Sequence, residues 1–205
     1  MGDATTDAAT DAAAVSGAGR RPLRADARRN RERVLRAAQE LFTADGLSVP
    51  LDEVARRAGV GAGTVHRHFP TKEALLAAIV VDRVELLVAQ GHALAASPDP
   101  EAALLRMLTL MLDEGAVSHP LKAALAGTDF DLRAAAPAAA AGLHAAVAVL
   151  LERAQLAGQV RRDLDADDVM SLLAGVFGMY QHANADAERA ARLRDVLFDG
   201  LRTVH

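Results

Sequence analysis

The sequence contains no cysteine and no tryptophan, and it has one tyrosine and five phenylalanines among its 205 residues. Without cysteine the chain can form neither disulfide bonds nor thiolate metal sites. The scarcity of aromatic residues argues against a β-sandwich and against a large aromatic pocket. No apolar run approaches the roughly 20 residues that a membrane-spanning helix needs. The first residues lack the basic start and apolar segment of a secretory signal, so we expect none.

Alanine accounts for much of the 51% of residues that are hydrophobic. Alanine is the strongest helix former, and the apolar residues show almost no alternation of the kind that strands require. A chain of this length suits one or two domains with a sizeable core. The composition therefore predicts an all-α fold.

The segment Leu51–Lys72 predicts two short helices joined by a tight turn. Gly59 supplies the positive φ that ends the first helix. The second helix is expected at Ala62–His68. Val65 within it and Phe69 directly after it are four residues apart and point back onto the first helix. This spacing is typical of a helix-turn-helix, in which the second helix enters the DNA major groove. The alternative is a helical hairpin without a nucleic-acid role.

The run GVGAGTVHRHFPTKEALL, residues 59–76, resembles the signature of TetR-type transcriptional regulators. Order and spacing are kept from about Arg28 to Leu76. The sequence departs from the pattern at His66, where the family usually has tyrosine, and at Pro50, where it often has a threonine or serine cap. The resemblance implies a three-helix DNA-binding head and a helical body that binds a small-molecule effector and dimerises, without a cofactor or enzymatic activity.

Charge is unevenly distributed along the chain, whose net charge is −4. Between Arg20 and Lys72 there are twelve Lys or Arg against six Asp or Glu, whereas residues 73–205 carry eleven against eighteen. A basic segment on an acidic chain attracts a polyanion to that segment. The pattern supports double-stranded DNA as the partner of the head.

Candidate DNA contacts follow from the resemblance and from the outward face of the second helix. We expect Arg67 and Thr64 to reach base edges or phosphates, and Arg67 to read guanine. Gly63 lets the backbone come close, while histidines and lysine fix the register on phosphates. The full set of candidates is Arg28, Ala62, Gly63, Thr64, His66, Arg67, His68 and Lys72.

Three segments are expected: a disordered arm over residues 1–24, a helix-turn-helix domain over 25–72, and an effector-binding and dimerisation domain over 73–205. The basic N-terminal arm is either a solvated linker or a flexible arm that binds phosphates or lies in a minor groove. Helices are predicted at Ala27–Asp45 before a Gly46 cap, Lys72–Ala95, Pro100–Gly115, Pro120–Ala126, Leu132–Leu156 with a restart at Pro137, from an Asp165 or Asp167 cap to Asn184, and Ala187–Val204.

The resemblance also places an effector pocket in the middle of the body and a dimer interface on its last two helices. For each pocket residue taken singly, ordinary core is the better interpretation. The pocket candidates are Met107, Met111, His119, Phe130, Leu143, His144, Val147 and Phe177. The interface candidates are Leu172, Val176, Tyr180, Leu193, Val196, Leu197 and Leu201.

The sequence contains no complete motif for a catalytic or metal-binding site. Asp163, Asp165 and Asp167 imitate the start of a calcium loop, but the later positions hold Asp168 and Ala174 where glycine and glutamate are needed. We therefore expect a cytoplasmic, homodimeric repressor that an effector of unknown chemistry releases from a palindromic operator. The rival hypotheses are a helical adaptor for an acidic protein and an all-helical enzyme.

Overall fold

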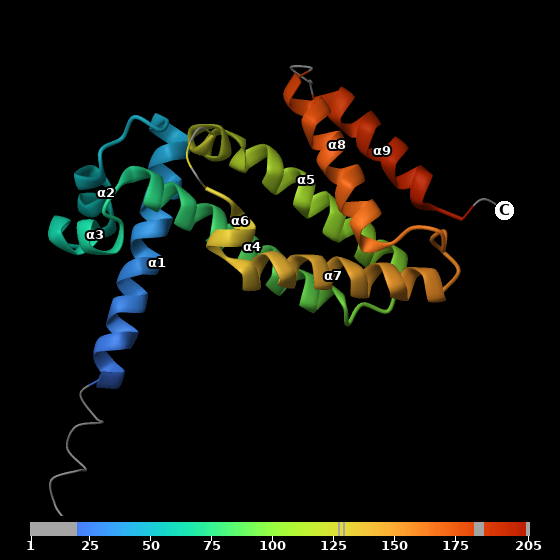
Figure 1. The fold of residues 1–205 in the computed structure, drawn as a ribbon, viewed down its shortest axis with the longest axis horizontal. Coiled ribbons are helices and arrows are strands. Elements are labelled where there is room, and N and C mark those ends of the chain that lie inside the picture. The colour runs from blue at the N-terminus through green and yellow to red at the C-terminus, as the bar shows by residue number, and fades with distance from the viewer. Residues whose placement is uncertain (1–19, 127, 129, 183–186, 204–205) are drawn as a thin grey trace, which may run out of the picture. The chain divides into compact units, whose positions relative to one another are not determined.

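The computed structural model describes residues 20–126, 128, 130–182 and 187–203, and these form helices and the turns between them (Figure 1). The chain divides between Lys72 and Glu73 into two compact units. We call the described residues up to Lys72 the head and those from Glu73 onward the body. The all-α prediction is confirmed. None of the helices in the described ranges is long and apolar enough to cross a membrane.

The head consists of α1 (Arg20–Asp45), α2 (Leu51–Ala58) and α3 (Ala62–His68). Two glycines with left-handed backbone separate the helices, as predicted: Gly46 has φ 76° and Gly59 has φ 65°. Only glycine adopts this conformation without strain, so it fixes both chain reversals. The head core combines the buried faces of all three helices, and its members are Val34, Leu35, Ala38, Leu41, Phe42, Val49, Val54, Ala55, Ala58, Val65 and Phe69.

The predicted start of the first helix at Ala27 is wrong, because α1 begins at Arg20. Residues 20–24, expected to belong to a disordered arm, are therefore helical. Pro22 lies in the first turn, where a missing N–H costs little because the first four amides of a helix have no partner. Short-range pairing then supports the exposed helix, since Arg28 Nε lies 3.0 Å from Glu32 Oε1 one turn later.

The body contains α4 (Lys72–Leu94, its first residue in the head), α5 (Pro100–Leu125), α6 (Leu132–Ala135), α7 (Pro137–Leu156), α8 (Ala166–His182) and α9 (Ala187–Leu201). Helix α5 packs against α7 and α8, and α9 lies beside α8 and runs in the opposite direction (Figure 1). The centre of the core is fully buried and comprises Leu104, Met107, Leu108, Val147 and Leu150. These residues hold α5 and α7 together.

The break predicted at His119–Pro120 is wrong, because α5 continues through Pro120 to Leu125. A proline inside a helix removes one backbone hydrogen bond and usually ends or bends the helix. Here the turns after the proline bury Leu121 and Leu125 against the body, and burial of two leucines offsets the lost bond. Residues on both sides of Pro120 therefore belong to one helix.

Other boundaries in the body follow the sequence. The helix restarts at Pro137, and Gly158 has φ 75° after α7 ends. Asp165 is the cap of α8: its carboxylate accepts a hydrogen bond from the Asp168 N–H at 2.9 Å, and the Asp168 carboxylate accepts one from the Asp165 N–H at 3.1 Å. This reciprocal pairing satisfies two amides at the start of the helix. Helix α9 ends at Leu201, earlier than the predicted Val204, which lies outside the described residues.

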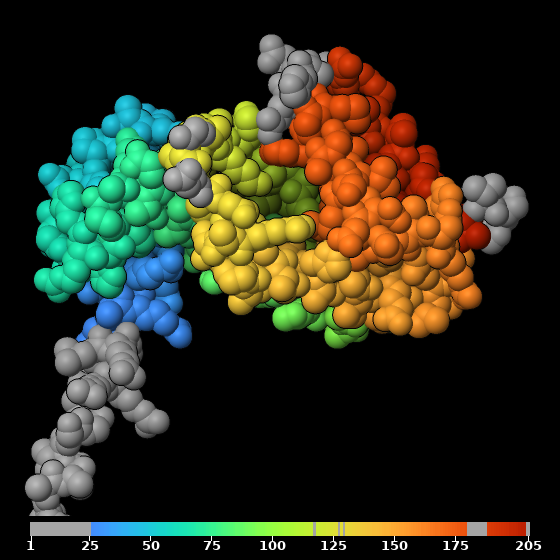
Figure 2. All heavy atoms as spheres, viewed as in Figure 1, coloured from blue at the N-terminus to red at the C-terminus, as the bar shows by residue number. Residues whose placement is uncertain are grey.

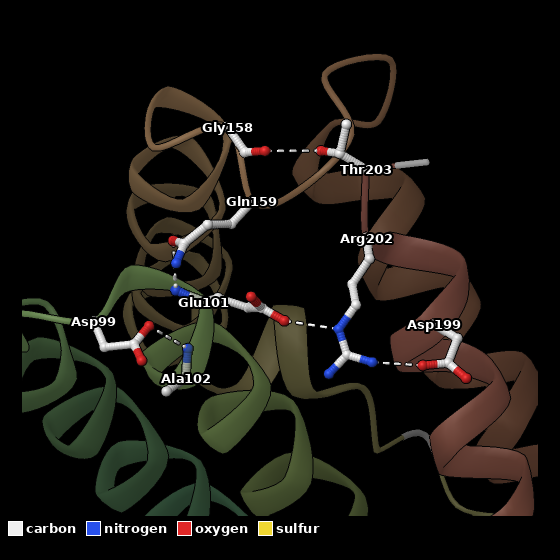
Figure 3. A network of polar contacts seen from close by, with 8 residues as sticks. All are labelled: Asp99, Glu101, Ala102, Gly158, Gln159, Asp199, Arg202 and Thr203. Carbon is white, nitrogen blue, oxygen red and sulfur yellow. Dashed lines mark hydrogen bonds and ion pairs between the residues drawn. The ribbon is translucent and has the colours of Figure 1, made fainter. Parts of the chain in front are cut away.

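Polar contacts join the residues after α9 to two parts of the body that are distant in the sequence (Figure 3). Arg202 Nε donates to Glu101 at 2.8 Å, and the Thr203 hydroxyl donates to the Gly158 carbonyl at 3.1 Å. Gln159 accepts from the Glu101 amide at 3.2 Å. The hydrogen bond to Glu101 raises the pKa of Arg202. We call this set the C-terminal clasp; it joins the last helix to the start of α5 and to the turn after α7.

Candidate functional site

Helix α3 is held against α2 by a compact turn. The Val60 amide donates to the Ala55 carbonyl at 3.1 Å, which closes α2 around the left-handed Gly59. Two side chains then fix the orientation of α3, because Val65 is 0% exposed and Phe69 is 3% exposed. The prediction that these two residues face inward is confirmed. The rest of the helix surface is consequently turned away from the core.

The outward face of α3 is small and polar. Ala62, Gly63, His66, Arg67 and His68 are exposed and Thr64 is half-buried. A methyl group added at Gly63 would meet no atom within 4 Å, so this surface is open. Arg67 has no ion pair or hydrogen bond with any described residue. Its guanidinium is therefore available to an external acceptor, for which its planar donors suit guanine or phosphate.

Several other cations of the head are already engaged. Arg56 forms a bidentate pair with Glu53, whose pKa this hydrogen bonding holds below its ordinary value. Arg57 lies 3.1 Å from Glu40. His66 Nε2 lies 3.1 Å from Asp52 Oδ1 at the start of α2. The imidazole that replaces the usual tyrosine thus has a partner within the head, which the sequence did not indicate.

The two remaining DNA-binding candidates lie outside α3. Arg28 is exposed on α1 and pairs with Glu32. Lys72 is the first residue of α4, and its Nζ lies 5.7 Å from the centre of the Phe42 ring. This cation–π contact holds the lysine stem on the head while its ammonium keeps its donors. The roles proposed for both residues stay predictions.

A cavity of about 280 Å³ lies in the body. Its wall comes from α4, α5, α6, α7 and α8, and Figure 2 shows the body hollowed between α6, α7 and α8. Most of the wall is apolar, and it includes Val80, Val84, Leu87, Met111, Leu112, Leu132, Leu143, Met170, Leu173 and Phe177. A mainly apolar cavity with a few polar groups is typical of a small-molecule site, and this one is at the small end of the usual range.

Three of the eight pocket candidates line this cavity: Met111, Leu143 and Phe177. Met107 and Val147 are fully buried and belong to the core instead. His144 is placed elsewhere, with its Nε2 3.1 Å from Asp167 Oδ1 beside a separate depression. His119 contacts the edge of the Phe177 ring, and Phe130 is half-buried outside the cavity wall. These five are not ligand-lining residues in this structure.

Four polar residues of the cavity wall are not among the pocket candidates: Arg83, Glu114, Ser118 and Lys122. The last three are spaced four residues apart on α5 and therefore share one face of that helix. This spacing was visible in the sequence, but the break predicted at Pro120 separated Lys122 from the other two. With α5 continuous, they form one polar strip along the cavity.

Several of the dimer candidates face the interior of their own chain. Val176, Leu197 and Leu201 are 7%, 8% and 1% exposed, because α8 and α9 bury these positions against the rest of the body. Leu172 and Val196 are exposed, as is Met179, which the sequence analysis did not select. Leu193 is half-buried, and the side chain of Tyr180 lies outside the described residues. An apolar surface remains on this helix pair, made of the candidates Leu172 and Val196 together with Met179.

No group of three or more His, Asp or Glu residues in the described ranges is arranged to hold a metal ion.

Comparison with known proteins gives matches over both units. Residues 34–79 match the family model described as bacterial regulatory proteins of the tetR family. Residues 99–203, half of the chain, match the C-terminal domain of SbtR-like transcriptional regulators. The first match covers the helix-turn-helix, and the second covers α5 to α9.

Solved structures resemble most of the chain. The TetR transcription regulatory protein from Mycobacterium vanbaalenii is 45% identical, with a TM-score of 0.70, over 89% of this chain and 100% of that one. A transcriptional regulator from Saccharomonospora viridis, solved in complex with choline, is 21% identical, with a TM-score of 0.63, over 85% and 98%. At that identity the second match speaks for the fold alone.

Among curated proteins, the HTH-type transcriptional regulator SrpR of Pseudomonas putida is 42% identical over 64 residues, which are 31% of this chain and 30% of that protein. The chain spans less than half of the length of the curated regulators that it matches. These matches are regulators and not enzymes.

Proposed function

Because the chain belongs to the TetR family of bacterial transcriptional regulators, we propose that it is a homodimeric repressor that leaves a palindromic operator when a small molecule fills the cavity of its body. The proposal places it in the cytoplasm with the DNA that it regulates. The observation that carries the DNA-binding part is the orientation of α3: Val65 and Phe69 are buried, and the outward face holds Arg67, which has no partner among the described residues.

In this proposal the residues of α3 divide into two roles. Arg67 reads a base edge in the major groove, with Thr64 beside it, because a bidentate arginine–guanine pair discriminates between bases. Ala62 and Gly63 let the helix backbone approach the DNA. His66, His68, Lys72 and Arg28 contact phosphates, which positions the head without reading sequence. His66 must exchange its contact with Asp52 for a phosphate to do so.

The variant Arg67→Ala tests this assignment. We expect it to lose about 1–3 kcal/mol of affinity, roughly 5- to 150-fold, for the selected operator and to keep its weaker binding to unrelated duplexes. Affinities would be measured by fluorescence anisotropy on both kinds of duplex at one fixed salt concentration, after selection of bound sequences from random DNA. The matched control is Arg106→Ala, which removes an exposed arginine from α5 in the body. Equal losses on operator and unrelated DNA would contradict base readout.

Dimerisation is supported by the exposed apolar side chains of α8 and α9. Leu172, Met179 and Val196 are 42%, 47% and 69% exposed. A two-fold dimer through this surface presents two copies of α3 to half-sites about 34–36 Å apart, one turn of the duplex. Two weak heads acting together then bind one palindrome far more tightly than either head alone.

We expect Val196→Glu to convert the dimer to a monomer, because two glutamates would be desolvated where two valines had packed. Sedimentation velocity at micromolar concentration would measure the change, and operator affinity should fall with it. Leu156→Glu is the control: Leu156 is 71% exposed at the end of α7 and belongs to neither helix of the pair. If the Val196 variant remains dimeric, the interface lies on another surface.

Release by a ligand is supported by the position of α4, which begins in the head and lines the cavity of the body. This helix supplies Val80, Arg83, Val84 and Leu87 to the cavity wall, and its first residue, Lys72, belongs to the head. A ligand that binds better to one position of α4 shifts the population toward that position. If the dimer that the ligand favours holds its two heads at the wrong spacing for adjacent major grooves, binding of the ligand lowers the affinity for the operator. Binding of the operator then lowers the affinity for the ligand by the same factor.

A further inference from the structure

The cavity in the body has one polar side, formed where α4 and α5 face each other. Arg83 projects from α4 and Glu114, Ser118 and Lys122 from α5, whereas the rest of the wall is almost entirely apolar. A ligand that fills this cavity therefore places most of its surface against hydrocarbon and one end near these four side chains. The charge of that end depends on which of the four are already paired.

One carboxylate oxygen of Glu114, Oε1, is engaged within the protein. It lies 2.7 Å from Arg83 Nη1 and also accepts a hydrogen bond from the Ser118 hydroxyl. Only 15% of the Arg83 side chain and 25% of the Glu114 side chain are exposed, so the pair is shielded from water. The Nε of Arg83 is buried and has no acceptor among the described residues. The pair is neutral in sum and leaves one N–H donor unsatisfied.

Lys122 has no such partner. No carboxylate oxygen of the described residues lies within 4 Å of its ammonium, whose Nζ is 5.5 Å from the centre of the Phe177 ring. The residue keeps contact with solvent at the edge of the cavity. Burial of the ammonium nevertheless lowers the pKa of Lys122, and the attraction of Glu114 acts in the opposite direction. The polar side of the cavity thus carries one uncompensated positive charge.

We infer that the effector is an amphipathic organic anion, whose carboxylate-like end group binds Lys122 beside the Arg83–Glu114 pair while its apolar part occupies the cavity. This inference rests on the proposed role of the body as the effector site and names the ligand class. Charge-assisted hydrogen bonds to such an end group are the strongest contacts that this wall can make. A cationic end group at the same position would be repelled by the unpaired ammonium of Lys122.

The size of the cavity limits the apolar part. At about 30 Å³ for each water-sized group, 280 Å³ holds roughly nine non-hydrogen atoms. A straight-chain acid of eight carbons has about this size, so octanoate is a suitable probe. 1-Octanol and octylamine have the same chain with a neutral and a positive end group, and they isolate the effect of charge.

The experiment measures binding of the three probes to the full chain by calorimetry without DNA. We expect octanoate to bind at least about tenfold more tightly than 1-octanol or octylamine. Lys122→Met should bring octanoate down to the level of 1-octanol, and Lys122→Arg should keep the preference. Lys72→Met is the matched control, because it removes the chain's other lysine, which lies in the head. Thermal melting curves verify that each variant is folded.

Three results would overturn the inference: binding of octylamine or choline in preference to octanoate, an octanoate affinity that Lys122→Met leaves unchanged, or no binding of any probe. Displacement of operator DNA is measured separately. Lys122-dependent binding of octanoate without displacement leaves the ligand class intact and counts against the proposed release. Displacement of operator DNA by a cation would support the proposed release and contradict the inferred ligand class.

Discussion

Replacing Phe69 by alanine is expected to unfold the head and abolish operator binding while the body stays folded. Phe69 is 3% exposed and follows α3 directly. Truncation of a buried phenylalanine costs about 3–5 kcal/mol, which is a large part of the roughly 5–15 kcal/mol that stabilises an ordinary domain. The ring also lies 6.0 Å from the Arg31 guanidinium, a contact that alanine cannot make. The head has few other large side chains to compensate.

Hydrogen exchange on the full chain measures this effect unit by unit. Amides of α1 to α3 should lose protection in the variant, whereas amides of α5 and α7 should exchange as in the unmodified protein. His68→Ala is the control, because the neighbouring His68 is exposed and its loss removes little packing. Retained protection of α3 in the Phe69 variant would show that the aromatic ring is not what holds this helix in place.

Gly91→Ala is expected to destabilise the body by about 1–3 kcal/mol, the usual cost of overpacking a core. Glycine-to-alanine changes inside a helix normally stabilise it, by up to about 1 kcal/mol. At Gly91, however, the new methyl carbon would lie 2.7 Å from the Ala146 Cβ on α7. Both atoms are attached directly to helix backbones, so neither can move aside without shifting α4 or α7. Denaturant unfolding followed by circular dichroism measures the change.

A second substitution removes the methyl group of Ala146 that the new side chain at position 91 would meet. In Gly91→Ala/Ala146→Gly the methyl group moves from α7 to α4, and the contact at 2.7 Å disappears. We expect Ala146→Gly alone to cost about 1 kcal/mol, and the double variant to be more stable than the two separate changes predict together. Additive losses would mean that the two helices separate without resistance.

The DNA-binding helix was predictable because local signals and packing agree there. Gly59 marks the turn, Val65 and Phe69 mark the buried face, and α3 has the bounds Ala62–His68 that the sequence predicts. Each of these signals acts within a few residues, and no distant part of the chain opposes them. The same holds for the Pro137 restart and for the Asp165 cap.

The cavity was only partly predictable because it depends on tertiary burial. The turn after Pro120 is helical since Leu121 and Leu125 pack into the body, which no local signal reports. Separating ligand-lining residues from core residues is harder still. Met107 and Met111 are one helical turn apart on α5, yet one is fully buried in the core and the other lines the cavity. Their surroundings, supplied by α4 and α8, decide the difference.

The C-terminal clasp has a consequence for the order in which the protein is made. Arg202 and Glu101 are 101 positions apart, so closing their contact costs more chain entropy than any local turn does. Domains fold from the N-terminus during synthesis, and the helices of the head are complete long before residue 203 leaves the ribosome. We expect the nascent protein to pass through a stage in which its head is folded while the helices of the body still lack the contacts of the C-terminal clasp.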